Sequence, residues 1–137
     1  MSKRAPVLGL LAMLVCVGGT AAMPAAKSPT AASFSKDVLP IFQRRCVACH
    51  VTGSEPGGMS LAPGLAYAQL VGKASTESAL PRVKAGKPDA SYLLHKLQGT
   101  QASVGGKGAR MPFGGPYLDD ASIAKIRAWI AAGAPKN

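Results

Sequence analysis

Three residues in the first half of the chain have the types and the spacing needed for covalent haem attachment. Cys46 and Cys49 are separated by two residues and His50 follows directly, in the run Cys46-Val47-Ala48-Cys49-His50. Residues three apart lie on one face of a helix, so both sulfurs can bond the two vinyl groups of one porphyrin. His50 can then present its imidazole to the iron as the proximal ligand. The motif predicts one covalently bound haem c.

Three other uses of these side chains compete with haem attachment. A disulfide between Cys46 and Cys49 is sterically poor inside a helix. A thioredoxin-like dithiol needs a strand-helix-strand context, which no pattern around the motif predicts. A structural zinc site needs a fourth ligand beside His50, and His95 is the only other histidine. The motif therefore favours haem attachment.

A bound haem needs a second axial ligand, and Met111 is the preferred candidate. It lies in a long glycine-rich segment, 99–117, and long loops in small domains usually carry function. A thioether is a soft, neutral ligand that raises the reduction potential when it coordinates opposite a histidine. Met111 is also far enough from His50 along the chain to reach the other face of the porphyrin. The alternatives are Met59, His95, a vacant sixth position, and a Met111 that only packs in its loop.

The ring of His50 is expected to be fixed by a second interaction. A histidine that binds a metal through one ring nitrogen usually donates the other N–H to a carbonyl or a carboxylate. Pro56 and Pro63 both lie nearby in the sequence, and the choice between their carbonyls stays open.

The composition also points to a cofactor. The chain has 137 residues, which predicts about one domain and excludes a large enzyme of several layers. Sixteen Lys and Arg against six Asp and Glu give a formal net charge of +10. Hydrophobic residues make up 47% of the chain, which argues against intrinsic disorder, but aromatic residues make up only 5%. A small domain with so few large side chains usually needs a metal, disulfides or a cofactor to complete its core.

The beginning of the chain has the pattern of a secretory signal peptide. A basic start is followed by the apolar run 7–17 and then by small residues. The pattern predicts a cleaved signal peptide over 1–22, with cleavage after Ala22, or alternatively after Ala21. Haem attachment takes place outside the cytoplasm, so the signal and the motif agree on a periplasmic location.

Two other interpretations of this segment fit it less well. An uncleaved membrane anchor needs about 20 strongly apolar residues, and only the first half of the segment is strongly apolar. Cys16 does not fit a lipoprotein signal, because Val15 stands where a small residue is required. After cleavage, residues 23–33 are expected to form a flexible leader, and 34–137 the folded domain.

The remaining patterns predict helices and no strands. The first helix should be capped by Ser35 or Asp37 and should place Val38 and Phe42 with both cysteines on its buried stripe. In the third helix, which Asp89 should cap, Tyr92, His95 and Lys96 are expected to face outward. In the last helix, Ile126, Trp129 and Ile130 should pack against the first helix near Val38 and Phe42. The expected helices cover about 35–50, 65–71, 90–97 and 119 or 120 to 132, which gives an all-α domain.

These features together resemble a small bacterial class I-like c-type cytochrome, a monohaem cytochrome c domain. The resemblance implies a cytochrome c-like fold of about four short helices wrapped around one covalently attached haem. It implies Cys46 and Cys49 as thioether sites, His50 as the proximal iron ligand and Met111 as the distal iron ligand. Leucine is common in such domains at the position of Met59, which weakens Met59 as a ligand. The segments that carry the resemblance are Phe34–Ile41 before the motif, Gly57–Leu61, Ala90–Leu94, Arg110–Pro112, Ile126–Ile130 and Gly133–Pro135.

The expected function is one-electron transfer. An iron with both axial positions filled by the protein cannot bind a substrate, so the chain is not expected to be an enzyme. The alternatives are a haem-based sensor or ligand-binding protein with an open sixth site, and a cytochrome subunit of a larger oxidoreductase complex. A peroxidase-like enzyme ranks last, because His95 is the only candidate for a distal acid-base residue.

The charge suggests which partners to expect. Arg44, Arg45, Lys107 and Arg110 flank the two regions expected at the haem. A basic surface there favours redox protein partners with acidic docking surfaces, although a generally basic, soluble surface explains the charge equally well. We expect no nucleic-acid partner, no small-molecule substrate, and membrane contact that is at most peripheral.

Overall fold

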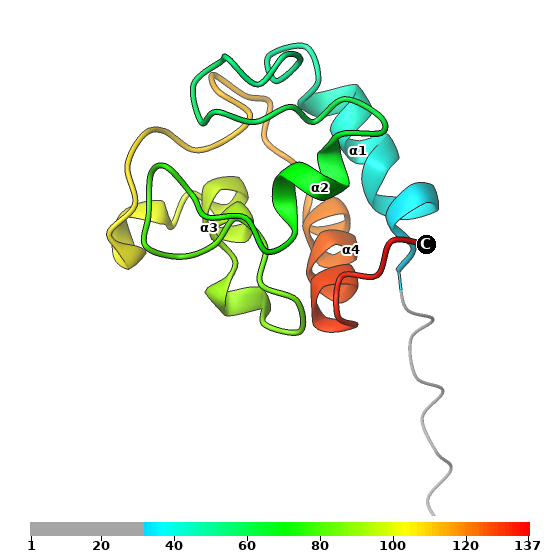
Figure 1. The fold of residues 1–137 in the computed structure, drawn as a ribbon. Helices are drawn as coiled ribbons and strands as arrows, with labels where there is room; N and C mark the ends of the chain where they lie inside the picture. The colour runs from blue at the N-terminus through cyan, green and yellow to red at the C-terminus, as the bar shows by residue number, and fades with distance from the viewer. Residues whose placement is uncertain (1–31) are drawn as a thin grey trace, which may run out of the picture.

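The computed structural model describes residues 32–137, and these residues form a helical domain (Figure 1). Within this range there is no β-strand, only two isolated bridges, Val71 with Val83 and Ala74 with Pro81. The expected all-α class is therefore confirmed. The signal peptide and residues 23–31 of the expected leader lie outside the described residues. The helical elements are the π-helical turn η1 (Phe34–Val38), α1 (Leu39–Arg45), α2 (Ala66–Leu70), the 3-10 turn η2 (Pro88–Ala90), α3 (Tyr92–Gln98), the 3-10 turn η3 (Gln101–Val104) and α4 (Asp120–Ala131).

The N-terminal helical segment begins with a reciprocal cap. The Ser33 hydroxyl accepts a hydrogen bond from the backbone N–H of Lys36 at 3.3 Å, and the Asp37 carboxylate accepts one from the N–H of Ser33 at 2.8 Å. Each side chain satisfies a backbone donor at the helix start that would otherwise lack a partner. The prediction that Ser35 or Asp37 would be the cap was therefore wrong by a few residues. The cap residue is Ser33, which was expected to end the flexible leader.

The prediction that the first helix carries both cysteines on its buried stripe was wrong. Helix α1 ends at Arg45, and Cys46 is its C-cap, with φ −130° outside the helical range. The next residues form tight turns, in which the N–H groups of Cys49 and His50 both donate to the Cys46 carbonyl at 3.1 Å. As a result Cys46 is partly buried and Cys49 is exposed. Phe42, in the preceding turn, is buried as expected.

The third helix also differs from its prediction, in both its cap and its exposed face. Asp89 is exposed and forms an ion pair with Arg127 at 2.8 Å, and α3 begins only at Tyr92. Tyr92 and Lys96, expected to face outward, are 4% and 8% exposed. They are buried because two chain segments cover this face of the helix. One precedes α3 and carries Glu77, and the other follows α3 and carries Lys107. His95 was also expected to face solvent, and its side chain is partly exposed.

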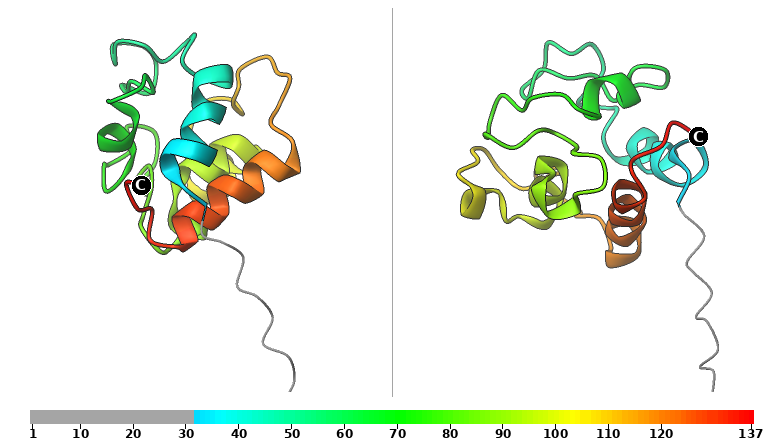
Figure 2. Two further views of the ribbon diagram at one scale, coloured as in Figure 1. Left: turned by 90° about the vertical axis from the view of Figure 1, so that its right-hand side faces the viewer. Right: turned by 60° about the horizontal axis from the view of Figure 1, so that its bottom comes forward.

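The last helix matches its prediction closely and organises the core. Asp119 caps α4 by accepting from the N–H of Ser122 at 2.8 Å, and the helix ends before Gly133, whose φ is +96°. Figure 2 shows α4 between α3 and the N-terminal helical segment. Trp129 is fully buried, with its ring centroid 5.2 Å from that of Phe34 in η1. The main partner of α4 at the N-terminus is thus η1 rather than α1.

The two ends of the described chain meet. The backbone N–H of Ser35 donates to the carbonyl of Asn137 at 2.8 Å, and Figure 1 shows the C-terminus beside η1. None of the helices within residues 32–137 is long and apolar enough to cross a membrane. This arrangement leaves α3, the segment after α1 and the segment before α4 to enclose the interior space described next.

Candidate cofactor site

One cavity brings the four predicted site residues together. It measures about 510 Å³, and Cys46, Cys49, His50 and Met111 all line it. We refer to it as the main cavity. Most of its surface is apolar, with Leu61 and several other leucines contributing. Pockets for small molecules and cofactors have volumes of about 300–1,000 Å³ and are mainly apolar with a few polar groups.

The two cysteines present their sulfurs differently to the main cavity. Both are free thiols. Burial raises the pKa of the Cys46 thiol to about 11, with Arg45 acting in the opposite sense and Cys49 adding to the rise. Cys46 is therefore a neutral thiol at physiological pH, while Cys49 lies exposed at the cavity edge.

His50 is half-buried and its Nδ1 atom has no hydrogen-bond partner among the described residues. Burial lowers the pKa of its ring, and the charge of Glu55 partly offsets this effect. The backbone of Met59 acts in the same direction as Glu55. The predicted hydrogen bond to the carbonyl of Pro56 or Pro63 is thus not formed. The peptide groups after Pro56 turn their carbonyls toward another side chain, as described below.

The loop that follows His50 is closed on itself. The N–H of Leu61 donates to the His50 carbonyl at 2.9 Å, and the Ser60 hydroxyl donates to the Val51 carbonyl at 2.6 Å. Within the loop the Glu55 carboxylate accepts from two backbone N–H groups, at 2.8 and 2.9 Å. These hydrogen bonds lower the pKa of Glu55 to about 2. The backbone on both sides of the His50 ring is therefore fixed independently of any ligand.

Met111 is held against the C-terminal end of α3. Its backbone N–H donates to the Lys96 carbonyl at 2.9 Å, and Arg110 Nε donates to the Leu97 carbonyl at 2.9 Å. The Arg110 guanidinium also stacks over the Tyr117 ring, 4.0 Å from its centroid. The Met111 segment is therefore docked by its backbone and by its neighbour, and its own thioether is free to face the main cavity.

The rival ligands occupy different positions. Met59 lines the main cavity, but its methyl group is on the side of His50: a Cβ at Gly57 would lie 3.9 Å from Met59 Cε and 3.8 Å from His50 Cε1. His95 does not line the cavity, and its ring nitrogens lie 2.9 Å from the Thr100 hydroxyl and 3.0 Å from the Asp89 carbonyl. Of the three candidates, Met111 combines access to the cavity with a position in a different chain segment from His50.

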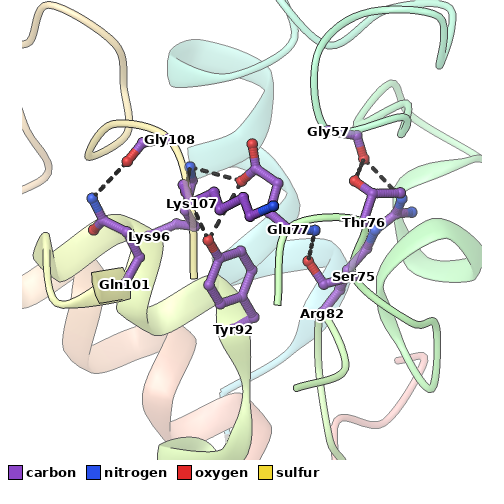
Figure 3. Close-up of polar contacts among 10 residues, drawn as sticks. All are labelled: Gly57, Ser75, Thr76, Glu77, Arg82, Tyr92, Lys96, Gln101, Lys107 and Gly108. Atoms are coloured by element: carbon purple, nitrogen blue, oxygen red, sulfur yellow. Dashed lines mark hydrogen bonds and ion pairs between the residues drawn. The ribbon is translucent and has the colours of Figure 1, made fainter. Parts of the chain in front are cut away.

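Sequence reasoning missed a polar wall of the main cavity, shown in Figure 3. Lys96 Nζ forms an ion pair with Glu77 at 2.8 Å and donates to the Lys107 carbonyl at 3.1 Å. The Tyr92 hydroxyl donates to the same carbonyl at 2.9 Å. Nothing in the local sequence pairs Glu77 with α3, because the contact depends on how a distant loop folds over the helix.

The basic residues expected around the site do not act as one group. Arg45 lines the cavity and donates to the Pro116 carbonyl, whereas Arg44 is exposed and does not line it. Lys107 is exposed. The rim is completed by Phe113, which is 78% exposed.

Comparisons with known proteins add no assignment. No protein-family model, curated protein or solved structure matches this chain. Within residues 32–137, no three His, Cys, Asp or Glu side chains gather in a group that could hold a metal ion by themselves. The main cavity and its lining residues are therefore the features that indicate a function.

Proposed function

We propose that this chain is an exported monohaem c-type cytochrome that carries one electron between periplasmic or membrane redox partners. One observation carries the proposal: the two sulfurs of a haem-attachment motif, its histidine and a distant methionine all line a single cavity of about 510 Å³. In the proposed assignment the domain has a cytochrome c-like fold, with its helices wrapped around the haem.

The residues around the main cavity fit the chemistry of haem. Each cysteine S–H would add across one vinyl group of the porphyrin, giving thioether bonds at Cys46 and Cys49. His50 and Met111 would be the axial ligands, and the largely apolar lining would accept the porphyrin ring. Haem supplies a reversible one-electron iron couple when it is bound. The protein's part is to hold both axial positions and to exclude water from them.

The remaining parts of the proposal concern location and partners. Residues 1–22 would direct export and be removed, and haem would be attached in the periplasm. Arg45, which lines the cavity, and the exposed Lys107, which precedes the lining residue Gly108, would contribute positive charge that speeds encounter with redox proteins that present acidic surfaces. We propose no enzymatic activity, nucleic-acid partner or small-molecule substrate.

The experiment is expression of the whole chain in a bacterial host that matures c-type haem, followed by absorption spectra in both redox states. We expect haem that survives acid-acetone extraction, and we expect this resistance to be lost when both Cys46 and Cys49 are replaced by serine. We also expect a weak long-wavelength band of ferric haem that marks sulfur ligation, absent from Met111→Ala. Met59→Leu is the matched control. Met59 lines the same cavity, and its replacement should leave the band unchanged.

The outcomes separate the proposed carrier from its alternatives. A chain that leaves this host without haem contradicts the proposal as a whole. Attached haem without the sulfur band, together with ready binding of carbon monoxide to the reduced protein, indicates an open sixth position. That result would replace electron transfer by sensing or ligand binding. Loss of the band in Met59→Leu rather than in Met111→Ala would move the distal ligand to Met59.

A further inference from the structure

Arg82 is a buried charge without an acidic partner. The residue is 8% exposed and lines the main cavity. Within residues 32–137 the ion pairs are Lys96 with Glu77 and Arg127 with Asp89, and neither includes Arg82. A buried charge is costly unless hydrogen bonds satisfy it, so the partners of this guanidinium need an explanation.

The short hydrogen bonds of Arg82 go to backbone carbonyls on two separate segments, and the Gln69 side-chain oxygen is a further acceptor at 3.4 Å. Nη2 donates to the carbonyls of Gly57 at 2.8 Å and Gly58 at 2.9 Å, and Nη1 donates to the carbonyl of Gln69 at 2.9 Å (Figure 3 shows the contact with Gly57). Gly57 and Gly58 have φ of +93° and +58°, a backbone conformation that residues other than glycine rarely adopt. Two consecutive left-handed residues turn both carbonyls toward one guanidinium. Arg82 thereby joins the tip of the loop after His50 to α2.

The first glycine of this pair, Gly57, faces the His50 ring. A Cβ built on Gly57 would be 3.8 Å from His50 Cε1, so the side of Gly57 that would bear a side chain faces the imidazole. The ring has no hydrogen bond at Nδ1 to fix its orientation. The base of the loop is held at the His50 carbonyl by Leu61, which fixes the backbone but not the ring. Gly57 therefore bounds one side of the ring, and Arg82 holds Gly57 in place.

We propose that Arg82 is a positioning residue for His50, acting through the Gly57–Gly58 carbonyls. The inference rests on the proposed function in one respect: that function makes His50 an iron ligand, and its position therefore important. Removing Nη1 and Nη2 of the guanidinium should release the tip of the loop and change the surroundings of the imidazole. Lysine cannot replace arginine here, because one ammonium cannot reach carbonyls on two segments in the planar geometry of a guanidinium.

The test uses the mature chain as purified, labelled with 15N and 13C in histidine. The chain has two histidines, and His95 lies outside the main cavity, so its ring signals are an internal control. Arg82→Lys keeps the charge, and Arg82→Gln removes it. Gln69→Ala is the matched control, because it removes only the side-chain acceptor at 3.4 Å and retains the Gln69 backbone carbonyl that Arg82 Nη1 binds at 2.9 Å. Ile130→Val is the control for a loss of core stability far from the loop.

We expect both Arg82 variants to shift or broaden the His50 ring signals while those of His95 stay in place. Gln69→Ala and Ile130→Val should leave both rings unchanged. If Arg82→Lys lowers the denaturant midpoint but leaves the His50 signals unmoved, Arg82 is merely structural and the proposal is wrong. If neither Arg82 variant folds, Gly57→Ala tests the same contact from the loop side, and unmoved His50 signals there also overturn it.

The absorption spectrum of the wild-type chain is recorded on the same samples. A chain without haem contradicts the proposed function, whereas the ring signals of His50 still report the contact with Gly57. A chain with haem and unresponsive His50 signals contradicts only the role of Arg82. The two proposals can therefore fail separately.

Discussion

The ion pair between Lys96 and Glu77 allows the cost of a buried charge in this fold to be measured against an exposed pair of the same length. Both this pair and the Arg127–Asp89 pair have a nitrogen–oxygen distance of 2.8 Å. The Lys96 and Glu77 side chains are 10% and 28% exposed, whereas those of Arg127 and Asp89 are 39% and 84% exposed. The two substitutions to compare are Glu77→Gln and Asp89→Asn, which keep the size of each side chain and remove its charge.

The expected magnitudes follow from what each cation keeps. After Glu77→Gln, the Lys96 ammonium stays buried without a carboxylate, and the Lys107 carbonyl at 3.1 Å remains as a neutral acceptor. Removing one member of a buried pair typically costs about 3–5 kcal/mol. Because Glu77 is partly exposed and that carbonyl remains, we expect a loss of about 2–3 kcal/mol in the free energy of unfolding. Asp89→Asn should cost about 0.5 kcal/mol or less, as is usual for exposed pairs.

The assay is urea unfolding followed by far-ultraviolet circular dichroism at one pH and salt concentration, with linear extrapolation to water. Lys96→Met completes the set: it removes the buried cation and leaves Glu77 near solvent, so it should cost less than Glu77→Gln. Equal losses for Glu77→Gln and Asp89→Asn would refute the reasoning. They would mean that water reaches Lys96 and that the polar wall of the main cavity is not desolvated.

Three further predictions follow from single contacts. Gly99→Ala should lower the unfolding free energy by about 1–2 kcal/mol, because Gly99 has φ +79° and a Cβ there would lie 2.9 Å from Arg110 Cδ. A urea unfolding midpoint equal to that of wild type would contradict this. The Glu55 carboxylate has a folded pKa of about 2, below its ordinary 4.5, so its stabilising effect is complete above about pH 4.5 and disappears as the pH falls toward 2. The difference in unfolding midpoint between wild type and Glu55→Gln should therefore shrink from pH 6 to pH 2.5, and a constant difference would show that the carboxylate is not held. In chain expressed without haem attachment, iodoacetamide at pH 8 should alkylate Cys49 well before Cys46, because a thiol of pKa about 11 is only about 0.1% thiolate at that pH; equal rates would mean that Cys46 is not buried in the haem-free chain.

Patterns that depend only on neighbouring residues were predicted well from the sequence. The last helix was expected to start at 119 or 120 and to stop at Gly133, and α4 runs over Asp120–Ala131. Its start depends on a local cap and its end on a glycine with positive φ, and both signals are contained within a few residues. Burial of Trp129 on the inner face was predicted for the same reason, because helical periodicity gives the face directly.

Features that depend on distant segments were predicted poorly. Tyr92 and Lys96 were assigned to the outer face of the third helix from periodicity, but a loop carrying Glu77 covers that face. The carbonyl of Pro56 or Pro63 was the candidate to bind His50, yet His50 Nδ1 has no hydrogen-bond partner within residues 32–137, and the next carbonyls after Pro56 turn toward Arg82, which lies far along the chain. In both cases the partner comes from a loop without regular structure, and no periodic pattern predicts where such a loop will lie.

The sequence by itself determined the helical class and the residues expected to bind haem, because both depend on spacing along the chain. Three-residue spacing of Cys46 and Cys49, with His50 adjacent, is a local property that holds whatever the rest of the fold does. Only the tertiary structure decided that Met111 reaches the same cavity, through backbone hydrogen bonds to the end of α3. It also decided that Gly57, whose carbonyl binds Arg82, faces the His50 ring, since the carbonyls that bind a buried guanidinium are chosen by the path of the backbone and not by side-chain type.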